Sequence, residues 1–161
     1  MNQDRLRELL NYDPSTGIFT WRMQRRGRAK VGTVAGTAHP KGYIRISIDH
    51  VDQLAHRLAW VFVHGPIDDS MVIDHINGNR CDNRIENLRA ATVCQNMRNC
   101  KAPITNTSGV KGVYLHKQLG KWTASIRIDK KLAHLGTFTT IFDAACARKS
   151  AEIKHYGEFA R

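Results

Sequence analysis

The chain has 161 residues, 42% of them hydrophobic, and a formal net charge of +11. This length suits one ordinary domain or two small ones. No apolar run approaches the roughly 20 residues that span a bilayer, and the polar N-terminus lacks a signal segment, so we expect no membrane partner. The four cysteines form no CxxC pair, which favours reduced thiols over disulfides or a structural zinc site.

The positive charge is concentrated at the two ends of the chain. Residues 1–50 carry +5, residues 51–100 carry −1 and residues 101–161 carry +7. Two basic flanks around a near-neutral middle favour a nucleic-acid partner, although surplus basic residues are often only solvated.

Local patterns predict a mixed first half. The expected elements are a helix over 2–11, a strand over 18–22, a strand over 42–49, a helix over 53–64, a strand over 72–75, a strand over 87–92 and a helix over 93–99. Arg25 and Arg26 lie in a basic loop that could follow a phosphate backbone or simply be solvated. His56 and Arg57, on the longer helix, could also face a phosphate.

The pattern changes after residues 101–109, a stretch without periodicity that we interpret as a linker. Strands are expected over 110–118, 121–128 and 131–138, followed by a helix over 140–156. The candidate packing residues of this helix are Phe142, Ala145, Ala147, Ile153 and Tyr156. An antiparallel three-stranded sheet with one helix on it is a compact α+β module.

The stretch 71–96 holds the residues suited to hydrolytic chemistry. Asp74, at a strand end, offers the hard oxygen that Mg²⁺ or Mn²⁺ prefers, and the Asn96 amide oxygen could complete a two-residue grip. A neutral His75 could deprotonate a water, and Asn87 could hold its other ring nitrogen. Each residue alone is more often structural, as a turn former, cap or surface amide.

This stretch resembles the HNH nucleases, in particular phage and intron-associated homing endonucleases. The matching positions are Ile73-Asp74-His75, Asn77-Gly78, Asp82-Asn83-Arg84, Asn87-Leu88-Arg89, Thr92 and Asn96, with upstream likeness through 55–60, over about residues 10–99. The resemblance implies that His75 is the general base, that Asp74 and Asn96 hold one divalent metal, and that Asn87 orients His75. It also implies a cytoplasmic location in a bacterium or a phage-infected cell.

The C-terminal part resembles the plant ethylene-response-factor (AP-two type) DNA-binding domain. The matching positions are Gly112-Val113, Gly120-Lys121-Trp122, Ala124, Ile126-Arg127, 135–138 and Ala144-Ala145. That family lays its sheet in the DNA major groove. The positions that the resemblance places on DNA are Lys111, Tyr114, His116, Ser125, Arg127 and His134.

Together these features predict an α+β protein: an N-terminal antiparallel sheet with a ββα-metal HNH core in residues 1–100, a linker over 101–109, and a DNA-binding domain over 110–161. We expect a monomeric, metal-dependent endonuclease of double-stranded DNA that uses one Mg²⁺ or Mn²⁺ and, with one active site per chain, cuts one strand. The alternatives are a DNA-binding regulator that has lost cleavage, or an RNA-directed protein.

Overall fold

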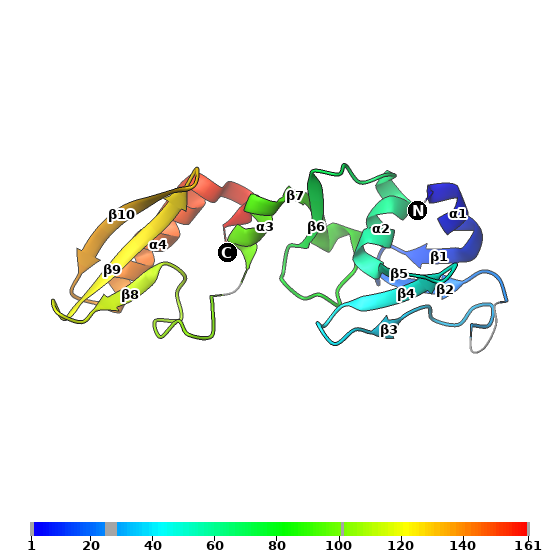
Figure 1. Cartoon of the computed structure of the whole chain (residues 1–161), viewed down its shortest axis with the longest axis horizontal. Coiled ribbons are helices and arrows are strands. Elements are labelled where there is room, and N and C mark those ends of the chain that lie inside the picture. The colour runs from blue at the N-terminus through cyan, green and yellow to red at the C-terminus, as the bar shows by residue number, and fades with distance from the viewer. Residues whose placement is uncertain (1, 25–28, 101, 161) are drawn as a thin grey trace. The chain divides into compact units, whose positions relative to one another are not determined.

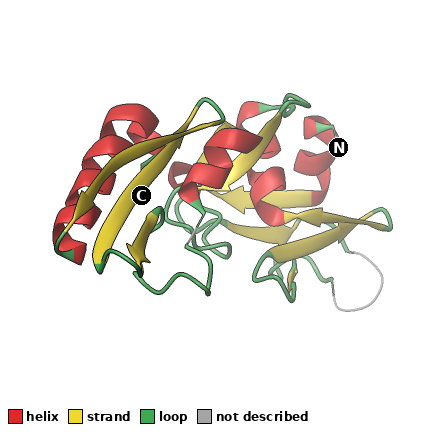
Figure 2. Cartoon of the chain, turned by 60° about the vertical axis from the view of Figure 1, so that its left-hand side comes forward, coloured by secondary structure: helices red, strands yellow, loops and turns green. Residues whose placement is uncertain are grey.

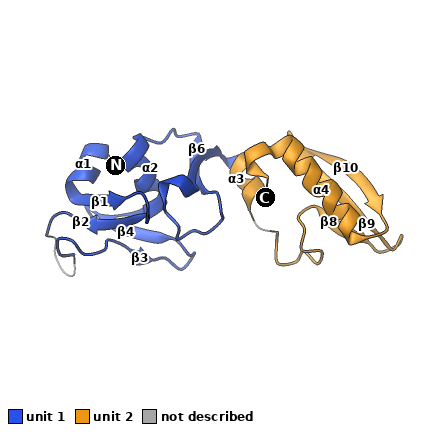
Figure 3. Cartoon of the chain, turned by 180° about the vertical axis from the view of Figure 1, so that it is seen from behind, with its two compact units in different colours: residues 1–93 blue, residues 94–161 orange. Residues whose placement is uncertain are grey.

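The chain folds into two compact units, residues 1–93 and 94–161 (Figure 3). The computed structural model describes residues 2–24, 29–100 and 102–160. Helices and small antiparallel sheets occur in both units, which confirms the α+β class. The division falls before residue 100, where we expected the nuclease domain to end, so nearly all of the helix expected at 93–99 belongs to the second unit. None of the helices in the described part of the chain has the length and apolar character that crossing a membrane requires.

The first unit combines two hairpins, a small sheet and two helices (Figure 1). In chain order these are α1 (Gln3–Leu9), β1 (Leu10–Asp13), β2 (Ile18–Trp21), β3 (Thr37–Ala38), β4 (Ile44–Ile48), β5 (Val51–Leu54), α2 (Ala55–His64), β6 (Met71–His75) and β7 (Leu88–Thr92), with a short 3-10 turn at Ile85–Asn87. β1 pairs with β2, β4 lies between β3 and β5, and β6 pairs with β7.

One hydrophobic core holds these elements together. Its fully buried members include Leu6, Leu10, Phe19, Ile46, Ile48 and Leu58. The rings of Tyr12 and Phe19 contact each other with centroids 4.7 Å apart, and both contact Phe62 of α2. The first hairpin therefore packs on α2, and α2 in turn contacts β6.

The helix predicted over 53–64 begins two residues later than expected, because residues 51–54 form a strand. Asp49 and His50 have φ values of +50° and +65°, and this tight turn pairs Ile48 with Val51. Two successive positive φ values are typical of a two-residue hairpin turn. The first predicted helix was also too long, since its last residues start β1.

The second unit is the sheet with one helix that the sequence predicts. It contains α3 (Val93–Asn99), β8 (Val113–His116), β9 (Lys121–Ile128), β10 (Lys131–Phe138), α4 (Ile141–Tyr156) and a 3-10 turn at Gly157–Phe159. β9 lies between β10 and β8 in an antiparallel sheet. Figure 2 shows α4 along one face of this sheet. Thr140 caps α4 by accepting a hydrogen bond from the Asp143 amide.

The face that α4 buries agrees with the prediction at Tyr156 and differs from it elsewhere. Phe142 and Ile153 are 72% and 61% exposed, whereas Arg148 and Glu152 are buried. Arg148 donates to Glu152 and to the carbonyl oxygen of Ser125 on β9. A buried guanidinium is tolerated because these partners satisfy it, so a polar pair occupies the place expected for apolar side chains.

Candidate active site

The hairpin of β6 and β7 presents Asp74 and His75 side by side. Asp74 pairs with Arg89 and His75 with Leu88 across the two strands. Both residues are buried: Asp74 is 7% exposed and His75 is 5% exposed. A carboxylate and an imidazole withdrawn from bulk water at one strand end are suited to catalysis, because their charges and protons respond strongly to neighbouring groups.

His75 is held by Asn83. The imidazole Nε2 lies 3.2 Å from Oδ1 of Asn83. An amide oxygen can only accept, so in this contact Nε2 carries the proton and Nδ1 carries the lone pair. Burial lowers the pKa of His75, an effect that the Asn83 hydrogen bond and the carboxylates of Asp74 and Asp82 partly offset. The ring is therefore neutral near pH 7 and can accept a proton.

The loop after His75 is fixed by asparagine side chains. Asn87 accepts from the backbone amide of Asn77 at 3.0 Å and donates to the carbonyl oxygen of Asp82 at 2.8 Å. Asn77 in turn accepts from the amide of Asn79 and donates to the Asp82 carboxylate. These bonds tie both ends of the loop together, so Asn87 supports the backbone that carries Asn83.

A salt bridge strengthens the same loop. Arg84 contacts the Asp82 carboxylate at 2.8 Å and the Glu86 carboxylate at 2.7 Å. The Arg84 hydrogen bond lowers the pKa of Asp82 to about 2. Asp82 thus stays ionised at every pH at which the protein would work.

The first hairpin of the chain anchors Asn83 from outside the loop. The hydroxyl of Tyr12 donates to the carbonyl oxygen of Asn83 at 2.7 Å. Gly17, at the turn between β1 and β2, approaches so closely that a Cβ there would lie 2.5 Å from Asn83 C and Arg84 N. Residues far upstream in the sequence therefore set the position of the group that orients His75.

Behind His75 lies a stack of rings. The His56 ring meets His75 edge-on with centroids 4.8 Å apart, and Tyr43 lies 5.2 Å from His56 and 6.1 Å from His75. The Arg80 guanidinium covers Tyr43 at 4.8 Å and donates to the carbonyl oxygen of Lys41. This stack closes one side of the imidazole and leaves it little freedom to tilt.

His56 is part of this stack, which does not fit the prediction that it contacts DNA. It lies on the buried side of α2 and is 5% exposed, while Arg57 is exposed. Burial, followed by the charges of His75 and Arg57, lowers the pKa of His56 to about 3. Among the described residues, no group hydrogen bonds to its buried Nδ1.

Asp74 faces a cation. The Arg89 guanidinium donates to Oδ2 of Asp74 from Nε at 3.1 Å and from Nη2 at 2.9 Å, and both side chains are largely buried. No cluster of three or more His, Cys, Asp or Glu residues suited to a metal occurs in the described part of the chain. The donor set still fits a hard divalent ion, since one carboxylate with amide, water and phosphate oxygens is a common Mg²⁺ environment.

The remaining predicted site residues are distributed over both units. Asn96 lies on α3 in the second unit and is partly buried. Arg25 and Arg26 lie outside the described residues. The predicted role of Asn87 in orienting His75 stays a prediction, because the contacts given for its side chain go to the loop backbone, whereas Asn83 contacts the ring.

The residues expected to face DNA from the second unit do not share one environment. Tyr114, Arg127 and His134 are exposed, and His116 is partly exposed. Ser125 is buried in the central strand. Lys111 donates its ammonium group to the carbonyl oxygens of Met97 and Cys100 at the end of α3. The expectation of a DNA contact therefore fits the exposed side chains better than it fits Ser125 and Lys111.

Comparison with known proteins gives the class of this site. Residues 53–98 match the family described as HNH endonuclease. Protein 3.8 of Escherichia phage T7 is 32% identical over 106 residues, covering 66% of this chain and 87% of that protein. The chain therefore belongs to the same protein family as Protein 3.8, and its residues 53–98 form an HNH endonuclease domain.

A solved structure, described as DNA binding and cleavage by the HNH homing endonuclease I-HmuI, shares 23% identity with a TM-score of 0.43. The match covers 56% of this chain and 51% of the other, so the chain spans about half the length of that protein.

Sequence reasoning did not assign roles to Asn83, Arg89 and Tyr43. Asn83 and Arg89 stand inside the quoted motif, so their identity was visible but their direction was not. Tyr43 stands on the Gly-Tyr strand that extends the resemblance upstream. Only the fold shows that these three side chains surround Asp74 and His75.

Proposed function

We propose that this protein is a metal-dependent DNA endonuclease of the homing type. The observation that carries the proposal is a buried, neutral His75 held through Nε2 by Asn83 beside the carboxylate of Asp74. With the proton on Nε2, Nδ1 takes a proton from a water as that water attacks the phosphorus of a phosphodiester bond. The P–O bond to the leaving oxygen breaks in the same displacement, and that oxygen takes a proton from solvent. Asn83 orients the ring and stabilises the imidazolium that forms.

Asp74 and Asn96 are the residues that would hold a divalent cation, Mg²⁺ or Mn²⁺. When bound, such an ion supplies positive charge to the phosphate oxygens and to the leaving oxygen. Asp74 contributes a hard carboxylate oxygen, and Arg89 beside it limits how strongly that carboxylate attracts a cation before DNA is present. The metal-ligand role of Asn96 rests on the motif.

The basic flanks supply affinity for double-stranded DNA. Arg57 in the first unit and Tyr114, Arg127 and His134 in the second are exposed and support such a surface. The net charge of +11 favours association with a polyanion in general. We propose that a monomer nicks one strand, since a chain with one His75 has one general base.

Plasmid cleavage tests the assignment of the base. His75→Ala should abolish Mg²⁺-dependent conversion of supercoiled plasmid to open circle, while gel-shift binding in EDTA stays near the wild-type level. His64→Ala is the matched control, because His64 is an exposed histidine at the end of α2 and stacks on Trp60 rather than on His75. Cutting by His75→Ala at the wild-type rate would contradict the role of His75.

A second candidate, a DNA-binding regulator without cleavage, is favoured by one contact. The Asp74 carboxylate is already engaged by Arg89 at 2.9 Å. If that pair persists when DNA and Mg²⁺ are present, the carboxylate is less available to a metal. The two functions are separated by the wild-type protein alone, which either opens supercoiled plasmid in Mg²⁺ and not in EDTA, or binds DNA without cutting it.

A further inference from the structure

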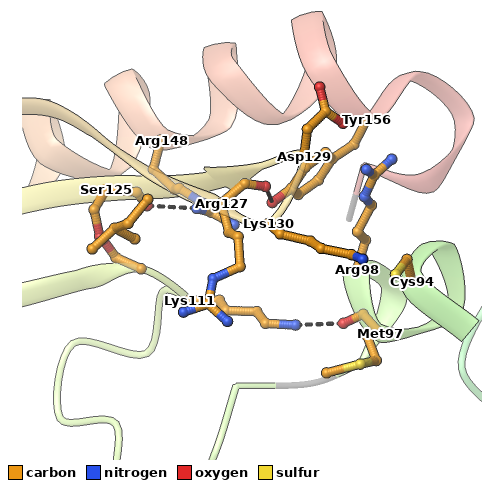
Figure 4. A pocket seen from close by; sticks show the side chains of 12 residues that line it. Cys94, Met97, Arg98, Lys111, Ser125, Arg127, Asp129, Lys130, Arg148 and Tyr156 are labelled. Carbon is orange, nitrogen blue, oxygen red and sulfur yellow. Dashed lines mark hydrogen bonds between the residues drawn. The ribbon is translucent and has the colours of Figure 1, made fainter.

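The second unit contains a cavity of about 660 Å³ whose lining is strongly basic (Figure 4). Its described lining residues include five bases and one acid: Arg98, Lys111, Arg127, Lys130, Arg148 and Asp129. Apolar groups from Met97 of α3 and Leu132 of β10 complete the walls. Its lining residues all belong to residues 94–161, and Asp74 and His75 are not among them.

The cavity forms along the part of β9 that β8 does not pair with. β8 pairs with residues 121–124, so the following part of β9 extends beyond it. Other groups occupy this edge instead. The amide of Ser125 donates to Gly112 O at 2.8 Å, Arg148 donates to Ser125 O, and the Tyr156 hydroxyl donates to Arg127 O at 2.8 Å. Bonded backbone and packed side chains make these walls firm.

Two of the five bases have structural partners. Arg148 forms an ion pair with Glu152 at 2.8 Å, which offsets part of its charge. Lys111 donates to the carbonyl oxygens of Met97 and Cys100. These contacts hold the two side chains in place, and their positive charge still contributes to the potential inside the cavity.

The other three bases, Arg98, Arg127 and Lys130, converge on the cavity. Arg98 lies over the Tyr156 ring at 4.5 Å. Figure 4 shows Lys130 extending toward the stem of Arg98, whose guanidinium turns toward Tyr156, and Arg127 reaching toward Lys111. The Asp129 carboxylate points away from Lys130 and Arg127. Positive charges that line one cavity repel each other, and an anion between them would convert that repulsion into attraction.

We infer that this cavity binds one nucleotide unit of a DNA strand, with its phosphate between Arg98 and Lys130. The volume is larger than one phosphate needs and lies within the range of small-molecule sites. The apolar sides of Met97 and Leu132 suit a sugar or base beside the phosphate. This inference rests on the proposed function for its choice of DNA. The cavity would be a DNA contact in addition to the exposed side chains of the sheet that were proposed above.

The test uses the full chain, a labelled DNA duplex and EDTA, so that no cleavage is required. Arg98→Gln combined with Lys130→Gln should reduce the slope of log affinity against log salt by about 1, because the neutralisation of one phosphate is lost. The control, Lys149→Gln combined with Lys154→Gln, removes the same charge from exposed positions of α4 that do not line this cavity. Lys130→Gln alone, at an exposed turn, should reduce the slope by part of this amount, because Arg98 still contacts the phosphate.

A second arm titrates free deoxyadenosine monophosphate. One outcome would overturn the assignment to DNA. In it, the wild-type protein binds this nucleotide, the Arg98→Gln/Lys130→Gln variant does not, and the salt slopes of this variant and of the control for duplex DNA are equal. The cavity would then be a site for free nucleotides. Equal behaviour of the cavity and control variants toward both ligands would overturn the phosphate site itself. Failure of the proposed nuclease activity is distinguishable, because it appears only as absent plasmid cleavage in Mg²⁺.

Discussion

Replacing Gly17 with alanine should impair cleavage, although Gly17 is far from Asp74 and His75 in sequence. Gly17 has a φ of +73°, and a Cβ at this position would lie 2.5 Å from Asn83 C and from Arg84 N. Both contacts are backbone atoms, which cannot rotate aside as a flexible side chain can. The segment that carries Asn83 therefore has to move by roughly 1 Å to restore ordinary van der Waals contact.

The expected magnitude has two parts. A non-glycine residue in the left-handed region costs about 1–2 kcal/mol, and overpacking a tight contact adds about 1–3 kcal/mol. The free energy of unfolding should therefore fall by about 2–5 kcal/mol in Gly17→Ala. Because Asn83 holds His75 at 3.2 Å, the same displacement should lower the cleavage rate, and a 1 Å misplacement costs on the order of 100-fold.

Gly32→Ala separates the clash from the backbone strain. Gly32 has a φ of +78°, and a Cβ there would meet nothing within 4 Å, so this variant carries the strain without the contact. Urea unfolding and single-turnover plasmid nicking, at a temperature where both variants are folded, compare the two. Equal stability and equal cleavage in Gly17→Ala and Gly32→Ala would refute the reasoning, because the packing of Gly17 on Asn83 and Arg84 would then not matter.

Three further changes test other contacts, two in the first unit and one in the second. Tyr12→Phe leaves the Asn83 carbonyl oxygen without its 2.7 Å donor and should lower the free energy of unfolding by about 1–3 kcal/mol in urea; an unchanged midpoint would contradict this. Burial lowers the pKa of His56 to about 3, whereas the unfolded chain has a histidine pKa of about 6.5. Between these two values the unfolded chain binds more protons, so the free energy of unfolding falls as pH falls, by at most about 1.4 kcal/mol per pH unit. Urea titrations at several pH values should show that this free energy falls less steeply with falling pH in His56→Gln. Arg148→Met strands Glu152 in the interior and should destabilise the protein by about 3–5 kcal/mol, and adding Glu152→Leu should restore much of the thermal stability.

The regular elements of the second unit were predictable because their signals are local. β9 alternates apolar and polar residues, and Thr140 and Gly157 mark the two ends of α4, so the predicted bounds of β9, β10 and α4 hold within a residue. The strand predicted over 110–118 was too long, since β8 covers Val113–His116. The strand β5 was missed for a local reason too. Its hairpin turns at Asp49 and His50, whose positive φ values are usually signalled by Asn-Gly or glycine.

Interactions between distant residues were not predictable in this way. The resemblance assigned Asn87 to orient His75, which stays a prediction, and nothing in the sequence favoured the choice of Asn83. The structure brings Asn83 to the imidazole because Tyr12 and Gly17 fix the course of the loop backbone. The same limit explains α4, where helical spacing could not reveal that the open edge of β9 would require Arg148 as a donor.

The HNH endonuclease match covers residues 53–98, but the arrangement around His75 needs more of the chain than that. Tyr12 and the Gly17 turn place Asn83. The carbonyl oxygens of Lys41 and Gly42 accept hydrogen bonds from Arg80 and Cys81, and the Tyr43 ring contacts His75. These contacts come from the hairpin β1–β2 and from the chain just before β4, which precede the matched segment. The motif therefore supplies Asp74 and His75, the side chains of the proposed reaction, and the N-terminal hairpin supplies contacts that hold the loop beside His75 in place.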